Sequence, residues 1–282
     1  MNVTEKIMSG VNNLPTLPTV YSSLTEAIEN PKTSSDKLAN IISNDQVSVF
    51  KILKLVNSPF YGFRGKIDTI SQAILHLGFN EVKNTVFALS VINFFSKDKI
   101  LLNFRPVDFW AHSIAVGIVT RIVGAEIGEK NLENYFLAGI IHDIGKLIFL
   151  EYAHDEYVKV LELVESKRCF IKDAESEIMG IDHSHAGQLL ANKWKLPQSI
   201  QNSILHHHKG IVGNETDLLV ASVHVGDIVS RMLELGYPGD NLVPEPNHKV
   251  WDILKISKGF FPQVRKRLIN DFSQTIRLML VD

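Results

Sequence analysis

The amino-acid sequence predicts an all-α protein, and two observations carry this prediction. Stretches whose apolar residues recur at the helical period cover most of the chain, and Pro, Gly and Asn residues separate them. No run of alternating apolar and polar residues indicates a strand. The 282 residues also contain no internal repeat and no low-complexity segment. We therefore expect a helical protein with a substantial buried core.

The first part of the chain is expected to form amphipathic helices at residues 20–29, 36–42, 46–56, 72–77 and 81–95. Ser34 or Ser35 is a suitable N-cap for the second helix and Ser71 for the fourth, which Gly78 ends. Residues 81–95 carry apolar side chains on most faces, so we expect this helix to be central and buried.

The third of these helices ends at Asn57, Ser58 and Pro59. Asn and Ser side chains satisfy unpaired backbone groups where helices end, so Asn57 and Ser58 are expected to cap or bridge helices. The aromatic segment that follows, residues 60–63, has two interpretations. It is either an exposed partner-binding patch or part of the core.

The remainder of the chain is expected to form helices at residues 108–127, 135–153, 156–165, 171–179, 183–195, 200–208, 217–235 and 261–280. A loop rich in Gly, Pro, Asn and Asp spans residues 236–246. The last helix has an exposed basic start at Arg265, Lys266 and Arg267.

Composition excludes several classes of protein. The net charge is −2 and no basic block stands out, so we expect no direct nucleic-acid binding. A single cysteine, Cys169, excludes an intramolecular disulfide and fits a reducing compartment. The first residues lack the apolar core of a signal peptide, and residues 84–95, taken as the longest nearly uncharged apolar segment, are too short to span a bilayer. We expect a cytoplasmic protein with no membrane association.

The most informative feature is the pair His142 and Asp143, inside the apolar stretch 136–150. Burying such a pair without partners is costly, and a metal ion is the strongest partner for an imidazole beside a carboxylate. Further ligand-type residues occur elsewhere in the chain: His112, His183, the triplet His206, His207 and His208, and Asp227. Helices can direct such side chains into a shared cavity, as in di-metal bundles. A His-rich set favours transition metals over calcium, and Lys146, one turn from His142, is placed to neutralise a substrate phosphate.

Each of these residues also has an ordinary structural interpretation. A lone buried histidine such as His112 is commonly a hydrogen-bonded core residue. The His206–His208 triplet fits a solvated helix end, where imidazoles complement the helix dipole. Asp227 has a charged neighbour one turn away, Arg231. We interpret His76, His154 and His248 as surface or structural residues. His185, two residues from His183, points to another helix face and is interpreted as a bystander.

Several segments resemble the HDOD domain, a bacterial output module related to the HD-type metal-dependent phosphohydrolases. They are Leu14-Pro15-Thr16-Leu17-Pro18, Ser43-Asn44-Asp45-Gln46, residues 51–58, residues 70–78, residues 109–113, residues 138–145, Trp194-Lys195-Leu196-Pro197 and His207-His208. The resemblance covers roughly residues 10–230. It implies an N-terminal helical bundle packed on an HD-like helical half. We accordingly expect an N-terminal subdomain at 1–103, an HD-like subdomain at 104–235, and a loop with a C-terminal helix at 236–282 that completes the fold.

The resemblance also implies ligand positions. His112, His142 and Asp143 match the first three metal-binding positions of the HD superfamily, and Asp227 matches the final aspartate. His183 is similar to the histidine of the next helix in the HD-GYP phosphodiesterases. His207 and His208 resemble their paired histidines, and Lys146 matches a lysine that approaches the substrate phosphate. Many HDOD members have lost these ligands, whereas this chain resembles a member that retains them.

One departure from the HD-GYP pattern bears on the substrate. Those enzymes follow the paired histidines with an acidic residue and, shortly after, an Asp-Gly and a Gly-Tyr-Pro segment, whereas here residues 209–213 read Lys-Gly-Ile-Val-Gly. Gly236-Tyr237-Pro238 lies past Asp227, and we interpret it as a coincidence. This departure argues against hydrolysis of cyclic di-GMP.

Three functions remain open. The chain is expected to act mainly as a regulatory module of bacterial signalling that binds signalling proteins and retains an HD-type site. The alternative is an active metal-dependent phosphohydrolase, with Asp143 and Lys146 as catalytic residues, acting on a nucleotide, cyclic dinucleotide or other phosphoester. A third interpretation is a sensor that binds a nucleotide without cleaving it. In each case one or two divalent metal ions are expected, iron or manganese first, with zinc, magnesium or nickel as alternatives.

Overall fold

The computed structural model describes residues 16–17, 19–30, 32–63, 65–95, 100–213, 215–257 and 259–281. Within these ranges the protein is all-α, as expected, and the only extended pairings are isolated bridges at Leu101–Phe104 and Val212–Glu215. Leu14, Pro15 and Pro18 of the HDOD-like motif lie outside the described residues.

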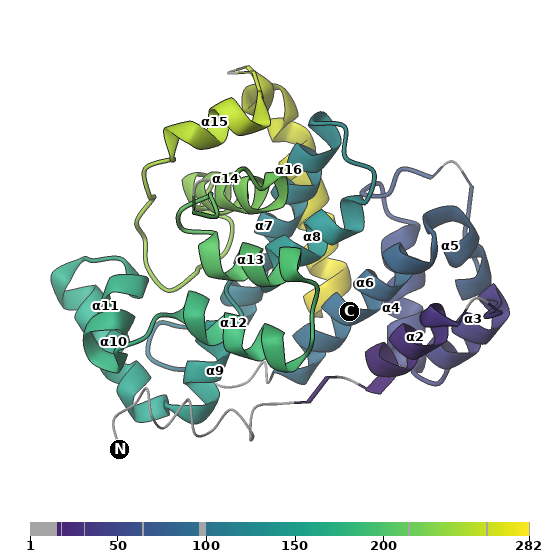
Figure 1. Cartoon of the computed structure of the whole chain (residues 1–282), viewed down its shortest axis with the longest axis horizontal. Helices are drawn as coiled ribbons and strands as arrows, with labels where there is room; N and C mark the ends of the chain where they lie inside the picture. Colours follow the sequence, from purple (N-terminus) through teal and green to yellow (C-terminus); the bar gives the residue numbers. More distant parts are fainter. Residues whose placement is uncertain are drawn as a thin grey trace.

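The first group of helices occupies the right of Figure 1. It comprises α2 (Thr19–Glu29), α3 (Ser35–Ser43), α4 (Gln46–Val56), α5 (Ile70–Leu77) and α6 (Phe79–Phe94). Ser34 caps α3 by accepting a hydrogen bond from the Lys37 amide. Thr69, not Ser71, caps α5, because Ser71 lies inside the first turn and its hydroxyl donates to Asp36 instead.

The second group begins with α7 (Pro106–Glu126) and α8 (Leu132–Ile141), the central helices of the molecule. They are followed by α9 (Gly145–Tyr152), α10 (His154–Lys167), α11 (Ile171–Met179), α12 (His183–Lys193), α13 (Gln198–His206) and α14 (Leu218–Met232). The chain ends with α15 (His248–Leu254), α16 (Phe260–Ile276) and a π-helical turn, η2 (Arg277–Val281). No helix was expected at α15, which Asn247 caps by accepting from the Lys249 amide.

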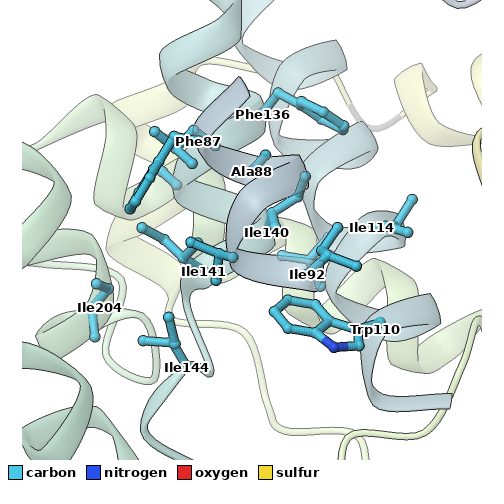
Figure 2. Close-up of a cluster of buried hydrophobic side chains, with 14 of the residues drawn as sticks. Phe87, Ala88, Ile92, Trp110, Ile114, Phe136, Ile140, Ile141, Ile144 and Ile204 are labelled. Atoms are coloured by element: carbon cyan, nitrogen blue, oxygen red, sulfur yellow. The ribbon is translucent and has the colours of Figure 1, made fainter. Parts of the chain in front are cut away.

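The core joins the two groups through α6, α7 and α8. Figure 2 shows Phe87, Ala88 and Ile92 of α6 facing side chains of α7 and α8. Every residue labelled in that view is at most 2 % exposed. As expected, α6 is the central helix of the first group and is buried on most faces. The C-terminal end returns to the first group, where Met279 O accepts a hydrogen bond from the buried Lys51 ammonium at 3.1 Å.

The apolar length of α7 corrects the expectation that no segment reaches membrane-spanning length. Among the described residues, this 21-residue helix is long and apolar enough to cross a bilayer, but 83 % of its most apolar window is buried inside the molecule. Its apolar residues therefore serve the core of the fold.

The segment after α4 connects the two groups by polar contacts. Asn57 bridges as expected: its side-chain amide donates to Leu53 O and Ile67 O, and its carbonyl oxygen accepts from the Ile67 amide. Phe60 is only 2 % exposed, so the exposed-patch interpretation is wrong for this residue. The Tyr61 hydroxyl donates to the buried Glu133 carboxylate at 2.8 Å, which also accepts from Arg121 at 3.1 Å. Burial raises the pKa of Glu133, against the opposing effect of Arg121.

One expected helix is interrupted. Residues 135–153 were expected to form a single helix, but α8 ends at Ile141 and α9 begins at Gly145, with His142, Asp143 and Ile144 in the turn between them. Adjacent side chains of a continuous helix point about 100° apart. The turn instead lets His142 and Asp143 face a common centre. Gly145 permits this path, because a Cβ there would lie 1.9 Å from His183 O.

Candidate metal centre

The ligand-type residues singled out in the sequence come from five places in the fold. His112 lies on α7, His142 and Asp143 in the turn before α9, His183 at the start of α12, His207 and His208 just past α13, and Asp227 on α14. Together they form three overlapping groups, in each of which the potential ligand atoms lie within 4.8 Å of one another: His112, His142 and Asp227; His142, Asp143 and His207; and His183, His207 and His208. All seven predicted residues are therefore brought together.

Asp143 is the centre of this arrangement. Its Oδ1 atom lies 3.0 Å from His183 Nε2 and 3.5 Å from His207 Nε2. Its Oδ2 atom lies 3.3 Å from His142 Nε2. Burial alone would raise the pKa of Asp143, but the neighbouring His142, Lys146 and His183 side chains outweigh it and hold the pKa well below its usual range. Asp143 is therefore ionised and shared between the two ends of the cluster.

His142 and His207 are oriented in the same way. The Nδ1 atom of His142 lies 2.8 Å from Gly139 O, and that of His207 lies 2.7 Å from Ile204 O. A carbonyl oxygen only accepts, so each Nδ1 carries the proton and each Nε2 presents a lone pair to the centre. Backbone contacts of this kind fix the orientation of metal-binding histidines.

His183 is held by a carboxylate instead. Its Nδ1 lies 2.5 Å from Glu175 Oε2, which also accepts from the His183 amide at 2.8 Å. The other Glu175 oxygen accepts from the Tyr157 hydroxyl at 3.2 Å. Burial lowers the pKa of His183, but the carboxylates of Glu175 and Asp143 outweigh burial and raise it to about 9. A carboxylate that orients a histidine in this way increases its strength as a ligand.

Asp227 completes the other end of the cluster. Its Oδ1 atom lies 3.0 Å from His112 Nε2 and accepts from Arg231 Nε at 2.8 Å. The Arg231 guanidinium also donates to Asp240 Oδ1 at 2.8 Å. Burial would raise the pKa of Asp227, but Arg231 and His112 hold it well below its usual range. From the sequence, Asp227 was either a member of the ligand cluster or a partner of Arg231. In the structure it contacts both His112 of the cluster and Arg231.

The residues fit a cation. Among the described residues, His142 Nε2 and His207 Nε2 are buried nitrogens without a hydrogen-bond partner, and both face Asp143, at 3.3 Å from its Oδ2 atom and 3.5 Å from its Oδ1 atom. Burial lowers the pKa of His207 to about 4, so its imidazole is neutral and available as a ligand. Leaving two such acceptors unsatisfied would cost a few kcal/mol, on the order of 1–3 kcal/mol each. A mixed imidazole and carboxylate set of this kind suits transition metals.

A backbone segment covers the cluster. We refer to residues 236–242 as the strap. Pro238 O of the strap accepts a hydrogen bond from Lys146 Nζ at 2.9 Å, and the same ammonium contacts Asp143 Oδ2. The Tyr237 amide donates to Asp108 O at 2.9 Å. Gly236 has φ +77°, and a Cβ there would lie 2.1 Å from the His112 amide nitrogen, so only glycine fits.

The strap changes two sequence interpretations. Gly236-Tyr237-Pro238, treated as a coincidence, lies against the predicted site. Lys146, expected to approach a phosphate, has a fully buried side chain that is already bound to Asp143 and Pro238. Two cavities of about 430 and 420 Å³ flank the strap, and none of the seven ligand-type residues lines either of them.

Two residues that support the cluster were not expected from the sequence. Glu175 and Asp240 are buried, at 0 % and 3 % exposure. Glu175 binds His183 of the cluster, and Asp240 binds Arg231, the partner of Asp227. Glu175 had a detectable signal. It lies on the buried face of α11 at helical spacing from Ile171, Ala174 and Met179, where an acid needs a partner. Asp240 lies in a loop without periodicity. His185, interpreted as a bystander, is exposed and bound to Asp182.

The fold and the site together define an all-α protein with a buried His and Asp cluster at its centre. Residues 14–210 match the HDOD domain family, and the chain belongs to this family. A solved HDOD domain protein of unknown function from Geobacter sulfurreducens is 24 % identical, with a TM-score of 0.82 over 99 % of this chain and 98 % of that one.

Two further solved proteins share the fold. A candidate metal-dependent phosphohydrolase from Shewanella amazonensis is 16 % identical, with a TM-score of 0.69 over 98 % of each chain. A candidate signal transduction protein from Marinobacter aquaeolei is 16 % identical, with a TM-score of 0.73 over 98 % of this chain and 65 % of that one. At these identities the likeness shows the fold alone.

Curated relatives are longer. An uncharacterised protein of Treponema pallidum is 22 % identical over 232 residues, which is 81 % of this chain and 44 % of that protein. The uncharacterised protein YuxH of Bacillus subtilis is 33 % identical over 85 residues, 30 % of this chain and 20 % of that one. The chain thus spans less than half the length of the curated relatives it matches.

Proposed function

We propose that this chain is a metal-binding regulatory module of bacterial signal transduction. One observation carries the metal-binding part: seven imidazole and carboxylate side chains from distant segments converge, and the Nε2 atoms of His142 and His207 have no hydrogen-bond partner among the described residues. His112, His142, Asp143, His183, His207, His208 and Asp227 would hold one or two divalent ions. Iron or manganese suits this set first, with zinc, magnesium or nickel as alternatives.

The closure of the site supports a regulatory role. His112, His142, Asp143, Lys146, His183 and His207 are all 0 % exposed. A substrate would need the strap to move before it could reach them. An ion in such a closed centre would tie α7, α12 and α14 together and stabilise one arrangement of the helices. A module of this kind acts through its surface, by contacting signalling proteins.

The second candidate function is phosphoester hydrolysis, and a specific observation favours it. Asp143 is positioned between the two ends of a complete ligand set, an arrangement suited to a pair of ions. Bound ions would acidify water and stabilise charge on a phosphate oxygen. If the strap opened, Lys146 would lose its bond to Pro238 O and become available to neutralise a nucleotide or other phosphoester.

Relatives point to both functions. The Shewanella amazonensis neighbour is described as a candidate metal-dependent phosphohydrolase and the Marinobacter aquaeolei neighbour as a candidate signal transduction protein. We prefer the regulatory proposal because the residues at the centre of the cluster are fully buried and His208, at its edge, is the partly exposed member.

The test combines metal analysis with an activity screen. Protein purified without chelator is expected to contain at least one transition-metal ion per chain, and a metal content near zero would remove both candidate functions. The loaded protein is then screened with phosphodiesters, nucleotides and cyclic dinucleotides. Under the regulatory proposal none is hydrolysed. Turnover that disappears in the His142→Ala, Asp143→Ala double variant would favour the enzyme.

A further inference from the structure

A large apolar cavity lies away from the metal centre. Its volume is about 620 Å³, and it is formed by α14, α15, α16 and the segment 243–246, at the top of Figure 1. This volume is within the range of about 300–1,000 Å³ that is usual for small-molecule sites. All lining residues come after residue 224, beyond the segment that matches the HDOD family. The cavity is therefore a feature of this chain outside the family match.

The exposed fraction of the lining residues increases from the base of the cavity to its mouth. Val225 and Leu268 are each 1 % exposed and form part of the base. The aromatic rings of Trp251 and Phe261 also line it. Met232, at 65 % exposure, lies at the mouth. An apolar surface that continues from the core to an exposed mouth favours a ligand with an apolar chain.

Arg265 is the only charged residue among the described residues that line the cavity. Its guanidinium has no hydrogen bond or ion pair with any residue that the structure describes. No acidic side chain lines the cavity within the described ranges. A permanently charged, unpaired guanidinium beside an apolar cavity is suited to a carboxylate, which it binds in bidentate geometry.

We propose that this cavity binds an amphipathic monocarboxylate, with its alkyl chain among the apolar side chains of α14 and α16 and its carboxylate on Arg265. Both parts of the ligand are required. The apolar lining supplies affinity, and Arg265 supplies the selectivity for an anionic head group.

The cavity and the metal centre share helix α14, so a bound ligand would contact residues next to those of the metal centre. On α14, Ile228 lines the cavity and directly follows Asp227. Met232 lines the cavity and directly follows Arg231, the partner of Asp227. The binding proposal does not require a loaded metal centre, so metal-free and metal-loaded protein are both expected to bind the ligand. Failure of the regulatory proposal would therefore leave this proposal intact.

The probe is dodecanoate, titrated into the full chain by calorimetry below the concentration at which it forms micelles. We expect saturable binding at one site per chain. Dodecanol, which has the same chain without the charge, is expected to bind about fivefold more weakly. The absence of saturable binding, or equal affinity for dodecanol, would overturn the proposal.

Two charge reversals provide matched variants. Arg265→Glu is expected to weaken dodecanoate binding about tenfold, because attraction is replaced by repulsion. Lys266→Glu makes the same charge change one position later, at a residue that does not line the cavity, and is expected to bind as the unchanged protein does. Both residues are exposed, so both variants are expected to fold. Equal weakening in the two variants would show a non-specific charge effect and overturn the proposal.

A cavity-filling variant tests the apolar part. Val243→Trp places a large side chain at the mouth, where Val243 is 46 % exposed, and is expected to abolish saturable binding while circular dichroism stays unchanged. Unchanged dodecanoate affinity in this variant would contradict the site. Association with neutral phospholipid vesicles, without binding of monomeric dodecanoate, would identify a membrane surface instead and also overturn the proposal.

Discussion

Glu175→Gln removes the charge that orients His183 and keeps the size and shape of the side chain. Glu175 Oε2 accepts from both the ring and the backbone of His183, at 2.5 and 2.8 Å, in a fully buried position. Hydrogen bonds to charged groups contribute about 1.5–3 kcal/mol. Removing a carboxylate that supports a metal-binding histidine typically weakens metal affinity by about 10–100-fold. We therefore expect Glu175→Gln to bind Mn²⁺ or Zn²⁺ at least about tenfold more weakly.

The assay is a competition titration against a chromophoric chelator, with thermal unfolding measured in parallel. Glu177→Gln is the matched control, because Glu177 lies on the same helix but is exposed and pairs with Lys167. The control is expected to bind metal as the unchanged protein does. Equal affinity in all three proteins would refute the argument that Glu175 supports a ligand. A loss of stability with no change in metal affinity would assign Glu175 a structural role only.

Three further predictions follow from the packing and charges. Gly145→Ala is expected to destabilise the fold by about 3 kcal/mol and to weaken metal binding, because its Cβ would lie 1.9 Å from the His183 carbonyl oxygen. Gly65→Ala is the control, because a Cβ there would meet nothing within 4 Å, and it is expected to change neither the free energy of unfolding in denaturant nor the metal affinity. Equal effects of the two substitutions would contradict this prediction. Since burial raises the pKa of Glu133, the folded state holds that proton more tightly, so stability from this group is present at low pH and is lost as pH rises through the raised pKa. Wild type is therefore expected to lose stability relative to Glu133→Gln as the pH rises above 4.5, measured by urea unfolding. The exposed Glu126→Gln control is expected to show no such trend, and a relative gain for wild type would show that the ion pair outweighs burial. Removing metal with a chelator is expected to lower the unfolding temperature, and re-addition of metal should restore it.

The helical fold was predictable because its elements depend on local pattern. The expected helices at residues 46–56 and 171–179 have the bounds that the structure shows. The interruption at His142 was not predictable from apolar periodicity, because the residues on both sides of His142 and Asp143 are mostly apolar. It depends on the contact between Gly145 and α12, which joins residues far apart in the sequence.

The residues of the ligand cluster could be predicted from their chemistry and from the family resemblance. The residues that hold them in place could not. Nothing in the sequence near Arg231 indicates that its second partner is Asp240, in a loop without periodicity. The Gly236-Tyr237-Pro238 segment was excluded on its distance in the sequence, yet the fold returns it to the site, where Pro238 O binds Lys146. Long-range contacts of this kind carry no local signature.

The most direct test of the metal centre is anomalous scattering from crystals of the full chain grown with Mn²⁺ or Zn²⁺. We expect one or two anomalous peaks enclosed by His112, His142, Asp143, His183, His207, His208 and Asp227. Peaks found only at surface residues such as His185, with the buried cluster lacking any, would contradict this expectation.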